Sequence, residues 1–419
     1  MKIYMETYGC SANQADGEMM LGLLKEGGFG TVDSPVDSDV NIINTCIVKT
    51  PTHNRMIYRI KKLTELKKPL IVAGCMPKVE RKVIEKINTK ASLIGPDSIE
   101  KIVDVVKKTM PRHKIVFLKD LRKPKICFPR VRKNPVVDIV EIASGCLGNC
   151  SFCQVKFAKG KLFSYPIDLI VKEVEESLKE GCKEIWITSQ DCGCWGFDRN
   201  SKLSELLKRL CKIKGKFFIR VGMMNPNCIK NIFDDIIDSY KSEKIFKFLH
   251  LPVQSGSDTI LKKMNRLYTV NEFKKMIKKF KKQFPLSTIS TDIIVGFPEE
   301  TKKDFQMTVD LIKEIKPDIV NISKFSPRPG TEAVKMEHLP VKTINKRSKN
   351  LMKIVKDIQL EQNKKWIGWE GDVLVNEVKR TNLTGHNFAY KSLVLKEGEI
   401  GEFKRVSIGS VSHTSLFER

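Results

Sequence analysis

Short apolar runs alternate with amphipathic stretches along most of the chain. In the first hundred residues, runs at 2–7, 40–44 and 70–73 have the length and apolar content of strands. Each is followed by a stretch of helical period, such as 15–25, in which Met19, Met20, Leu23 and Leu24 share one face. This alternation predicts a small parallel α/β domain with helices on both faces of its sheet.

The alternation resumes after residue 135 and repeats six times. We expect strands at 136–142, 184–188, 217–221, 246–251, 289–295 and 319–324. Helices are expected at 169–178, 204–210, 229–239, 259–264, 271–280 and 303–315. Six such units predict a partial (β/α)6 barrel, in which a site forms at the carboxyl ends of the strands.

The last part of the chain changes character. A long charged amphipathic helix is expected from 341 to about 365, and short alternating runs separated by Gly and Asn follow Gly368. Such runs predict a small β-barrel. The segment 106–132 is rich in positive charge, contains prolines and has no clean period, which is typical of a linker. We therefore divide the chain into 1–105, 106–132, 133–357 and 358–419.

The net charge of +26 points to an anionic partner. Eleven Lys and Arg residues against one acid lie in 107–133, and nine against one lie in 262–282. A generally basic composition is the alternative explanation. No run is long and apolar enough for a bilayer, and no signal peptide is evident, so a soluble cytoplasmic protein is expected. In that compartment twelve cysteines indicate metal or redox chemistry.

Three of the cysteines, Cys146, Cys150 and Cys153, lie on one loop in a C-x3-C-x2-C spacing, directly after a predicted strand. Gly145 and Gly148 allow that loop to fold around a small object. A [4Fe–4S] cluster held by three thiolates keeps one iron free for another molecule. A zinc knuckle and unliganded core thiols remain alternatives, although no fourth zinc ligand sits in register nearby.

Three more cysteines, Cys10, Cys46 and Cys75, follow the first three predicted strands. Ligands of open α/β sheets lie outside the carboxyl ends of the strands, so these cysteines are expected to meet in space. One such cysteine is usually a small core residue. Three at the same end favour a second metal cluster.

The spacing of Cys146, Cys150 and Cys153, with Phe152 before the last, resembles the radical S-adenosylmethionine (SAM) enzymes. The preceding Y-G-C-x2-N-x2-D, N-T-C and A-G-C runs resemble the methylthiotransferases of that superfamily, as do H-L-P-x-Q-S-G from His250 and F-S-P-R-x-G-T from Phe325. The resemblance implies two [4Fe–4S] clusters, one on each set of three cysteines. It also implies SAM as both radical source and methyl donor.

The resemblance further implies SAM contacts just past the barrel strands. They comprise Ser189, Gln190, Asp191, Arg220, Gln254, Asp292, Gly296 and Glu299. Asp191 is expected to accept from the SAM ammonium, and Arg220 is expected to pair with its carboxylate. The alternatives are an inter-strand salt bridge for Arg220 and helix capping for Glu299.

The run after Cys153, ending in Ser164-Tyr165-Pro166, resembles the archaeal and eukaryotic branch that modifies threonylcarbamoyladenosine next to the tRNA anticodon. This implies C2 hydrogen abstraction and methylthio transfer. Lys156, Lys159 and Lys161 are expected to pair with the threonylcarbamoyl carboxylate or with phosphate. Arg328 is expected to meet phosphate or SAM. The tail resembles the TRAM domain, an RNA-binding module, in which Phe388 is expected to stack on unpaired bases.

The partners implied are a tRNA anticodon stem-loop, a sulfur source and an electron donor such as a ferredoxin or flavodoxin, with no membrane. The alternatives are a related enzyme acting on isopentenyladenosine in tRNA or on a ribosomal protein, and a non-catalytic zinc and RNA-binding protein. Cys127 is given no role. Cys192 and Cys194 are expected to be free thiols, with a third cluster as the alternative, and Cys182, Cys211 and Cys228 are expected to be structural.

Overall fold

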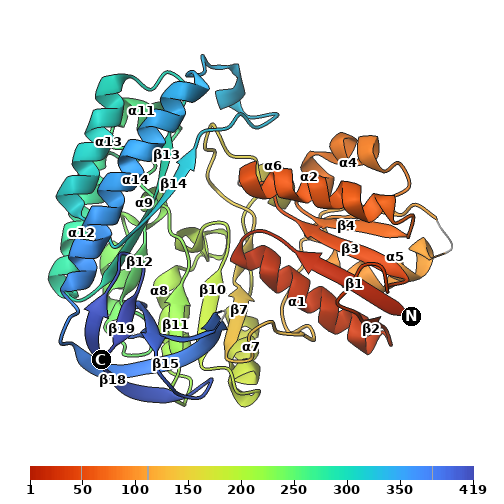
Figure 1. Ribbon diagram of the computed structural model, residues 1–419, viewed down its shortest axis with the longest axis horizontal. Coiled ribbons are helices and arrows are strands. Elements are labelled where there is room, and N and C mark those ends of the chain that lie inside the picture. Colours follow the sequence, from red (N-terminus) through yellow and green to blue (C-terminus); the bar gives the residue numbers. More distant parts are fainter. Residues whose placement is uncertain (49, 111–112, 380) are drawn as a thin grey trace.

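The computed structural model describes residues 1–48, 50–110, 113–379 and 381–419, which form three lobes (Figure 1). The N-terminal lobe is a six-stranded parallel sheet in the order β2-β1-β3-β4-β5-β6. Its strands are β1 (Lys2–Thr7), β2 (Gly30–Thr31), β3 (Val40–Thr45), β4 (Leu70–Gly74), β5 (Ser92–Ile94) and β6 (Val116–Phe117). Its helices are α1 (Ser11–Glu26), α2 (Thr50–Glu65), α3 (Met76–Val79), α4 (Arg81–Ile87) and α5 (Ile102–Thr109).

Helices cover both faces of this sheet, as predicted. Ile42 packs with Met19 and Met20 of α1, whereas its neighbour Ile43 packs with Met56 and Ile60 of α2. Successive residues of a strand point to opposite faces, so two adjacent isoleucines join two separate cores. β3 and β4 are buried throughout, which explains their uninterrupted apolar sequences.

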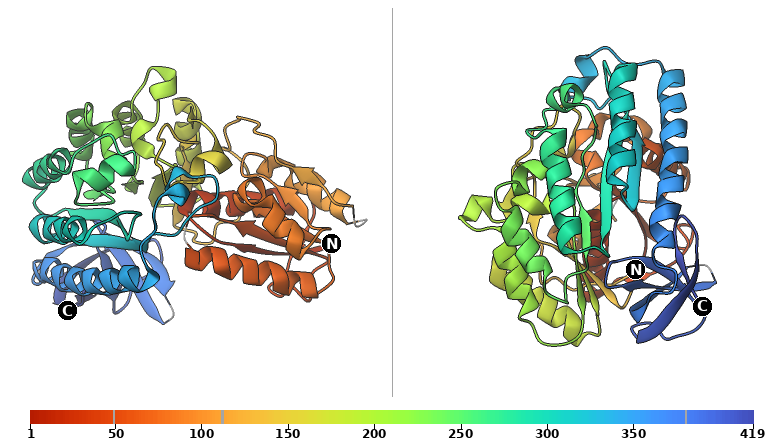
Figure 2. Two further views of the ribbon diagram at one scale, coloured as in Figure 1. Left: turned by 90° about the horizontal axis from the view of Figure 1, so that it is seen from above. Right: turned by 90° about the vertical axis from the view of Figure 1, so that its left-hand side faces the viewer.

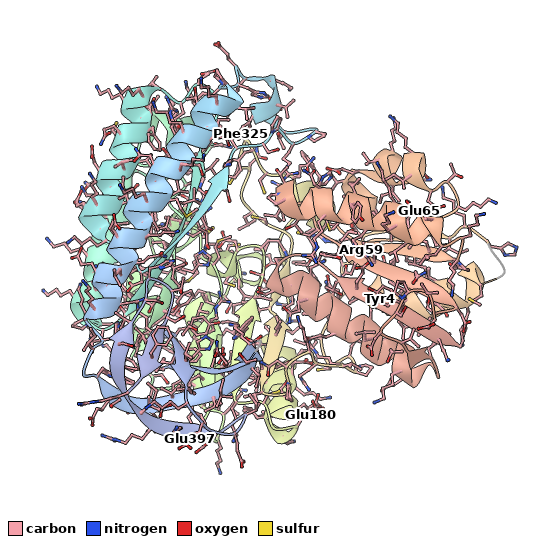
Figure 3. All side chains as sticks on the ribbon, viewed as in Figure 1. Tyr4, Arg59, Glu65, Glu180, Phe325 and Glu397 are labelled. Atoms are coloured by element: carbon pink, nitrogen blue, oxygen red, sulfur yellow. The ribbon has the colours of Figure 1, made fainter. Side chains whose placement is uncertain are left out.

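The basic segment 106–132 was expected to be a linker, and residues 111–112 of it lie outside the described residues. The described part is integrated into the fold. It supplies β6, the edge strand of the N-terminal sheet. Arg130 is buried and pairs with Glu173 at 2.6 Å, and Arg132 pairs with Asp138 and with Glu180, which Figure 3 labels. Part of the positive charge counted in the sequence is therefore neutralised inside the protein.

The middle lobe confirms the partial (β/α)6 barrel. Two three-stranded parallel sheets, β7-β10-β11 and β12-β13-β14, are joined by a bridge between Ile219 and Ile245. The strands are β7 (Val137–Glu141), β10 (Glu184–Thr188), β11 (Phe218–Val221), β12 (Phe248–His250), β13 (Thr288–Val295) and β14 (Ile319–Lys324). A short antiparallel pair, β8 (Ala143–Ser144) and β9 (Phe163–Ser164), flanks the cysteine loop.

Eight helices of the described chain belong to this lobe. They are α6 (Val155–Lys159), α7 (Ile167–Lys179), α8 (Leu203–Cys211), α9 (Pro226–Ile229), α10 (Phe233–Tyr240), α11 (Asp258–Lys263), α12 (Val270–Gln283) and α13 (Lys302–Ile315). Thr269 and Thr301 close capping boxes at the starts of α12 and α13. Short 3-10 turns occur at Cys192–Cys194, Phe197–Arg199 and Glu332–Lys335, and another, Ile99–Lys101, precedes α5.

The C-terminal lobe is a closed barrel in the order β15-β16-β17-β19-β18, which confirms the predicted β-barrel. Its strands are β15 (Glu370–Lys379), β16 (Asn382–Asn387), β17 (Ser392–Leu395), β18 (Phe403–Val411) and β19 (Leu416–Glu418). The long helix α14 (Val341–Lys364) leads into it, so the boundary expected at 357/358 falls within a helix. None of the described helices combines the length and apolarity needed to cross a membrane.

The two flanking lobes pack against different parts of the middle lobe, and α1 of the N-terminal lobe packs against Ile139 of β7. The N-terminal lobe lies beside the middle lobe in Figure 1 and in the left view of Figure 2, and β1 runs from the N-terminus toward it (Figure 1). The C-terminal barrel packs where the barrel strands begin. There Lys183, just before β10, donates to the Gly401 carbonyl at 2.7 Å, and the Lys247 amide, just before β12, donates to the Phe388 carbonyl at 2.8 Å. The carboxyl ends of the strands are thus left to face the cysteine loop.

Candidate active site

Cys146, Cys150 and Cys153, here called the barrel triad, lie on the loop between β8 and α6. Gly145 has φ +80°, and a Cβ there would lie 2.0 Å from the Lys161 carbonyl oxygen, so glycine is needed at this turn. The Ser151 amide donates to the Met264 carbonyl at 3.1 Å, and Asn265 Nδ2 donates to the Asn149 carbonyl at 2.7 Å. The segment after α11 therefore holds the loop from outside.

Two donors already point at sulfur atoms of the barrel triad. The Gly148 amide donates to Cys146 Sγ at 3.2 Å, and Arg266 Nη1 donates to Cys150 Sγ at 3.4 Å. Burial raises the pKa of Cys146 to about 12 and that of Cys153 to about 11, and neighbouring thiols of the triad add to both shifts. Neighbouring thiolates raise both of these pKa values, which indicates that the thiols lie close together. A bound cation or cluster relieves the repulsion between the thiolates.

Cys10, Cys46 and Cys75, here called the N-terminal triad, come from three neighbouring strands, β1, β3 and β4. Cys10 precedes α1, Cys46 follows β3, and Cys75 precedes α3. Because the strands are parallel and adjacent, their carboxyl ends meet at one edge of the sheet. The structure brings Cys10 and Cys46 into hydrogen-bonding contact.

Close packing surrounds the N-terminal triad. Gly9 has φ +117°, and a Cβ there would lie 2.9 Å from Cys46 Sγ. The hydrogen bond from Cys10 lowers the pKa of Cys46 to about 7, whereas burial raises that of Cys75 to about 12. Asn13 Oδ1 and Asn44 Oδ1 are buried without a hydrogen-bond partner among the described residues. Unsatisfied buried acceptors are costly and call for a further ligand or water.

A buried set of four charged residues connects the N-terminal triad to the barrel. Lys159 Nζ lies 3.2 Å from Asp16 Oδ2 and 3.6 Å from Glu141 Oε1. Lys125 pairs with the same two carboxylates, at 2.8 Å for Glu141. Both lysines and both acids are at most 5% exposed. The Lys159 charge favours ionisation of Cys10 and Cys75. We call these four residues the buried charge network.

The residues of both triads fit an iron–sulfur group. Each triad offers three thiols that interact electrostatically with one another, and a [4Fe–4S] cluster can be held by three thiolates. The barrel triad has hydrogen-bond donors aimed at two sulfurs, and the N-terminal triad has a buried ammonium beside it. Positive charge and donors around thiolates are the features that stabilise such clusters.

Of the residues after β10, Gln190 is the one best placed to meet a ligand. Its Oε1 is buried and has no partner among the described residues. Ser189 Oγ accepts from the Asp191 amide at 3.2 Å. Asp191 Oδ1 accepts from the Gly193 and Asn225 amides, each at 3.0 Å, and Oδ2 accepts from the Cys228 thiol at 3.2 Å. These bonds orient the carboxylate, and its contact with the SAM ammonium stays a prediction.

His250 at the end of β12 and Asn321 within β14 converge on Asp292 within β13. Its Oδ1 lies 3.1 Å from His250 Nε2 and accepts from Asn321 Nδ2 at 2.8 Å. Gln254 has φ +71°, and its backbone pairs with Asp292 and Ile294. These contacts set the shape of the barrel mouth, where the predicted SAM contacts of Gln254 and Asp292 stay predictions.

Gly296 and Glu299 follow β13. Gly296 has φ +74°, and a Cβ there would lie 2.5 Å from Ile344 of α14, so its glycine is required by packing. Glu299 is exposed and pairs with Lys263 at 2.5 Å, next to the segment that holds the barrel triad. Capping of α13 is carried out by Thr301 and not by Glu299.

Arg220 was expected to pair with the SAM carboxylate, and the structure places it among aromatic rings. Its guanidinium lies 5.2 Å from the Trp186 ring, 5.1 Å from the Phe248 ring and 5.2 Å from the Tyr390 ring. Tyr390 belongs to the C-terminal barrel. Arg220 therefore contributes to the contact between two lobes through cation–π interactions. Its Nε is buried without a hydrogen-bond partner among the described residues, and its pairing with the SAM carboxylate stays a prediction.

The lysines after Cys153 differ in their surroundings. Lys159 is buried and pairs within the buried charge network, so its contact with RNA stays a prediction. Lys156 is half-buried. Lys161 is exposed and, with Arg122 and Lys123, lines a cavity of about 240 Å³ between the lobes. This cavity also contacts Ser144, Lys159 and the two acids Asp97 and Asp120.

Arg328 and Phe388 also have structural partners. Arg328 Nη2 donates to the Val48 carbonyl at 3.0 Å and to Thr50 Oγ1 at 3.1 Å, which ties the end of the barrel to the loop after Cys46. Phe388 packs against Trp366 and Trp369, with ring centroids 5.9 and 6.1 Å away. The stacking platform expected of Phe388 is thus used inside the C-terminal lobe.

Arg266 and the buried charge network were missed from the sequence. Nothing in the sequence around Arg266 indicates a sulfur contact, because its partner Cys150 is 116 residues away. Asp16 did give a signal, since it is a charged residue between Ala15 and Met19 on the apolar face of α1. A buried acid of this kind requires a cation, which here comes from residues 109 and 143 positions away.

Comparison with known proteins agrees with this geometry. Residues 140–312 match the radical SAM superfamily, and residues 2–95 match the uncharacterized protein family UPF0004. The fold is similar to a radical SAM methyltransferase, TsrM from Kitasatospora setae, with a TM-score of 0.57 and 12% identity over 80% of this chain and 77% of that one. At that identity the likeness concerns the fold alone.

Relatives of much higher identity cover nearly the whole chain. A probable threonylcarbamoyladenosine tRNA methylthiotransferase of Pyrococcus horikoshii is 43% identical over 99% of this chain and 98% of its own. The corresponding protein of Methanothermobacter thermautotrophicus is 39% identical over 99% of both chains. The human threonylcarbamoyladenosine tRNA methylthiotransferase is 36% identical over 97% of this chain and 71% of its own. The chain belongs to the threonylcarbamoyladenosine tRNA methylthiotransferases, within the radical SAM superfamily.

Proposed function

We propose that this protein converts N6-threonylcarbamoyladenosine next to the anticodon of tRNA into its 2-methylthio derivative. The observation that carries the proposal is the presence of two cysteine triads in one chain, of which the N-terminal triad is connected to the barrel by the buried charge network. When bound, a [4Fe–4S] cluster on the barrel triad supplies reductive cleavage of SAM, and one on the N-terminal triad supplies sulfur for methylation by a second SAM.

The residues of the chain divide the remaining tasks. Cys146, Cys150 and Cys153 hold the first cluster, and Gln190 supports SAM through its unpartnered Oε1. Arg266 places positive charge at Cys150. These groups position and shield the reactants, because removal of hydrogen from a C2 carbon is beyond acid–base catalysis.

The substrate adenosine enters between the barrel and the N-terminal lobe. Its base must leave the stack of the anticodon loop to reach the barrel mouth. The cavity lined by Arg122, Lys123 and Lys161, with Asp97 and Asp120 also in its wall, offers cations for the threonylcarbamoyl carboxylate. An isopentenyl group is uncharged and has no carboxylate for these cations to bind. The cations therefore favour the threonylcarbamoyl substrate. A cellular sulfur donor and an electron donor such as a ferredoxin or flavodoxin complete the cycle.

Nucleoside mass spectrometry tests the proposal. The gene is expressed in a host whose own enzyme has been deleted, and tRNA nucleosides are compared with and without it. The 2-methylthio-threonylcarbamoyl nucleoside is expected to appear only with the gene. A methylthio group on isopentenyladenosine or on a ribosomal protein would support one of the related activities instead, and a colourless anaerobic preparation would indicate a non-catalytic zinc protein.

A further inference from the structure

Two cysteines outside both triads lie beside a carboxylate near the barrel triad. Cys194 is in the 3-10 turn after β10, and Cys228 is in the short helix α9. The Sγ atoms of Cys194 and Cys228 and a carboxylate oxygen of Asp191 all lie within 4.8 Å of one another. Asp191 and Cys194 are buried, and Cys228 is partly buried. The proposed function uses neither cysteine.

The Asp191 carboxylate is held with one oxygen aimed at the cysteines. The Gly193 and Asn225 amides both donate to Oδ1, whereas Oδ2 faces Cys228 Sγ at 3.2 Å. Cys194 Sγ in turn lies 3.3 Å from the Asp191 carbonyl oxygen. Hydrogen bonds that orient the outer oxygen of a carboxylate are the usual support of a metal ligand.

The spacing of these atoms suits zinc. Around a tetrahedral Zn²⁺, with bonds of about 2.3 Å to sulfur and about 2.0–2.2 Å to oxygen, neighbouring ligand atoms are roughly 3.5–3.8 Å apart. The measured 3.2 Å between Oδ2 and Cys228 Sγ needs only a small adjustment. Magnesium and calcium prefer oxygen ligands throughout, so two sulfur ligands favour a softer ion of the zinc class.

A fourth ligand can reach this position from outside. Cys228, Asn225 and Asn227 line a cavity of about 250 Å³, which also contacts Cys150 and Asn265. Three protein ligands leave one tetrahedral position for water or a small anion. Cys192, by contrast, directs its thiol toward Ser189 and the Ile187 carbonyl, so it is not part of the set.

We propose that Asp191, Cys194 and Cys228 form a zinc site, which uses none of the six triad cysteines but lies next to the barrel triad, and whose fourth ligand is an exchangeable water or anion from this cavity. Binding releases the two thiol protons to solvent and fixes the turn after β10 to α9. The site goes beyond the proposed function, since no step assigned to either triad needs it.

Metal analysis of the full chain tests this site. The protein, with both clusters reconstituted anaerobically, is incubated with zinc chloride and freed of loosely bound metal on a chelating resin. Elemental mass spectrometry is expected to find about one zinc per chain beside about eight iron. Cys194→Ala and Cys228→Ala are each expected to lose at least tenfold of the zinc with unchanged iron. Asp191→Asn is expected to retain a weakened site.

Two controls separate this zinc from other metal binding. Cys211→Ala, which removes a half-buried thiol of α8, is expected to keep the zinc. Cys150→Ala is expected to lose about half of the iron and keep the zinc. If the alanine variants fold poorly, Cys228→Ser replaces Cys228→Ala in the zinc measurement. The proposal is overturned if wild-type protein holds less than about a tenth of a zinc per chain. Zinc unaffected by the Cys194 and Cys228 substitutions, or a Cys194–Cys228 disulfide in the anaerobic protein, also overturns it.

Discussion

The barrel triad and the N-terminal triad each consist of three cysteines, but the two sets are brought together in different ways. The barrel triad lies on a single loop, and its spacing alone brings the thiols together. The N-terminal triad comes from the ends of three strands between residues 10 and 75, so it exists only once β1, β3 and β4 have paired. We infer that the first is a local motif and the second is a product of the fold.

The electrostatic surroundings of the two triads differ in the same way, being local for the barrel triad and dependent on the fold for the N-terminal triad. Cations and donors reach the barrel triad as single groups, the Gly148 amide and Arg266. The N-terminal triad interacts with the buried charge network, in which Lys125 and Lys159 come from outside the N-terminal sheet. The N-terminal triad therefore depends on the contact between two lobes, whereas the barrel triad does not.

This difference also explains what could be predicted from the sequence. The cysteines were predictable, because loop spacing and strand order follow from local pattern. The burial of Lys159 was not, since α6 is a five-residue helix whose environment is created by the packing of another lobe. The same reason applies to the contacts that Arg220 and Phe388 make at or inside the C-terminal lobe, which the local sequence does not indicate.

The largest expected effect is on the barrel triad. Cys150→Ala removes one of three thiolates, so the protein is expected to lose about half of its iron and at least ~100-fold of its SAM cleavage. Liquid chromatography of 5′-deoxyadenosine after reduction measures this. Cys182→Ala, a buried cysteine of the barrel core, is the matched control. Cleavage at the wild-type rate in Cys150→Ala would refute the assignment of this triad.

The dependence of the N-terminal triad on the buried charge network is tested by Lys159→Met. The change leaves Asp16 and Glu141 with one cation fewer in a buried site, and about 3–5 kcal/mol of unfolding free energy is expected to be lost. Denaturant unfolding followed by circular dichroism measures it. Lys161→Met, an exposed neighbour, is expected to be close to wild type. Equal stability of the two variants would show that the network is not structural.

Arg266 tests whether the barrel triad is tuned by a single cation. Arg266→Met removes the donor at Cys150 Sγ, and its positive charge no longer favours the reduced state. The potential of that cluster is expected to fall by about 60 mV, a tenfold change for one electron. A redox titration monitored by electron paramagnetic resonance measures this potential. The potential of Arg266→Lys is expected to lie between those of the wild type and Arg266→Met. A rise in potential would contradict the account.

The smallest effect is a pH dependence of the buried charge network. Burial raises the pKa of Glu141, but Lys125 and Lys159 outweigh it and lower that pKa to about 2. A carboxyl whose pKa is lowered by folding stabilises the protein above its unfolded pKa and loses this as the pH falls. The stability difference between wild type and Glu141→Gln is therefore expected to narrow from pH 7 to pH 4 in urea unfolding. A stability difference between the two proteins that increases as the pH falls would contradict the lowered pKa of Glu141.

The division of labour between the triads is tested most directly by replacing Cys10, Cys46 and Cys75 together with alanine. The variant is reconstituted anaerobically and incubated with reductant, SAM and threonylcarbamoyladenosine-containing tRNA. Because the barrel triad is intact and local, 5′-deoxyadenosine is expected to form while no methylthio nucleoside appears. Formation of the methylthio nucleoside, or loss of SAM cleavage in a variant that keeps about four iron per chain, would contradict the account.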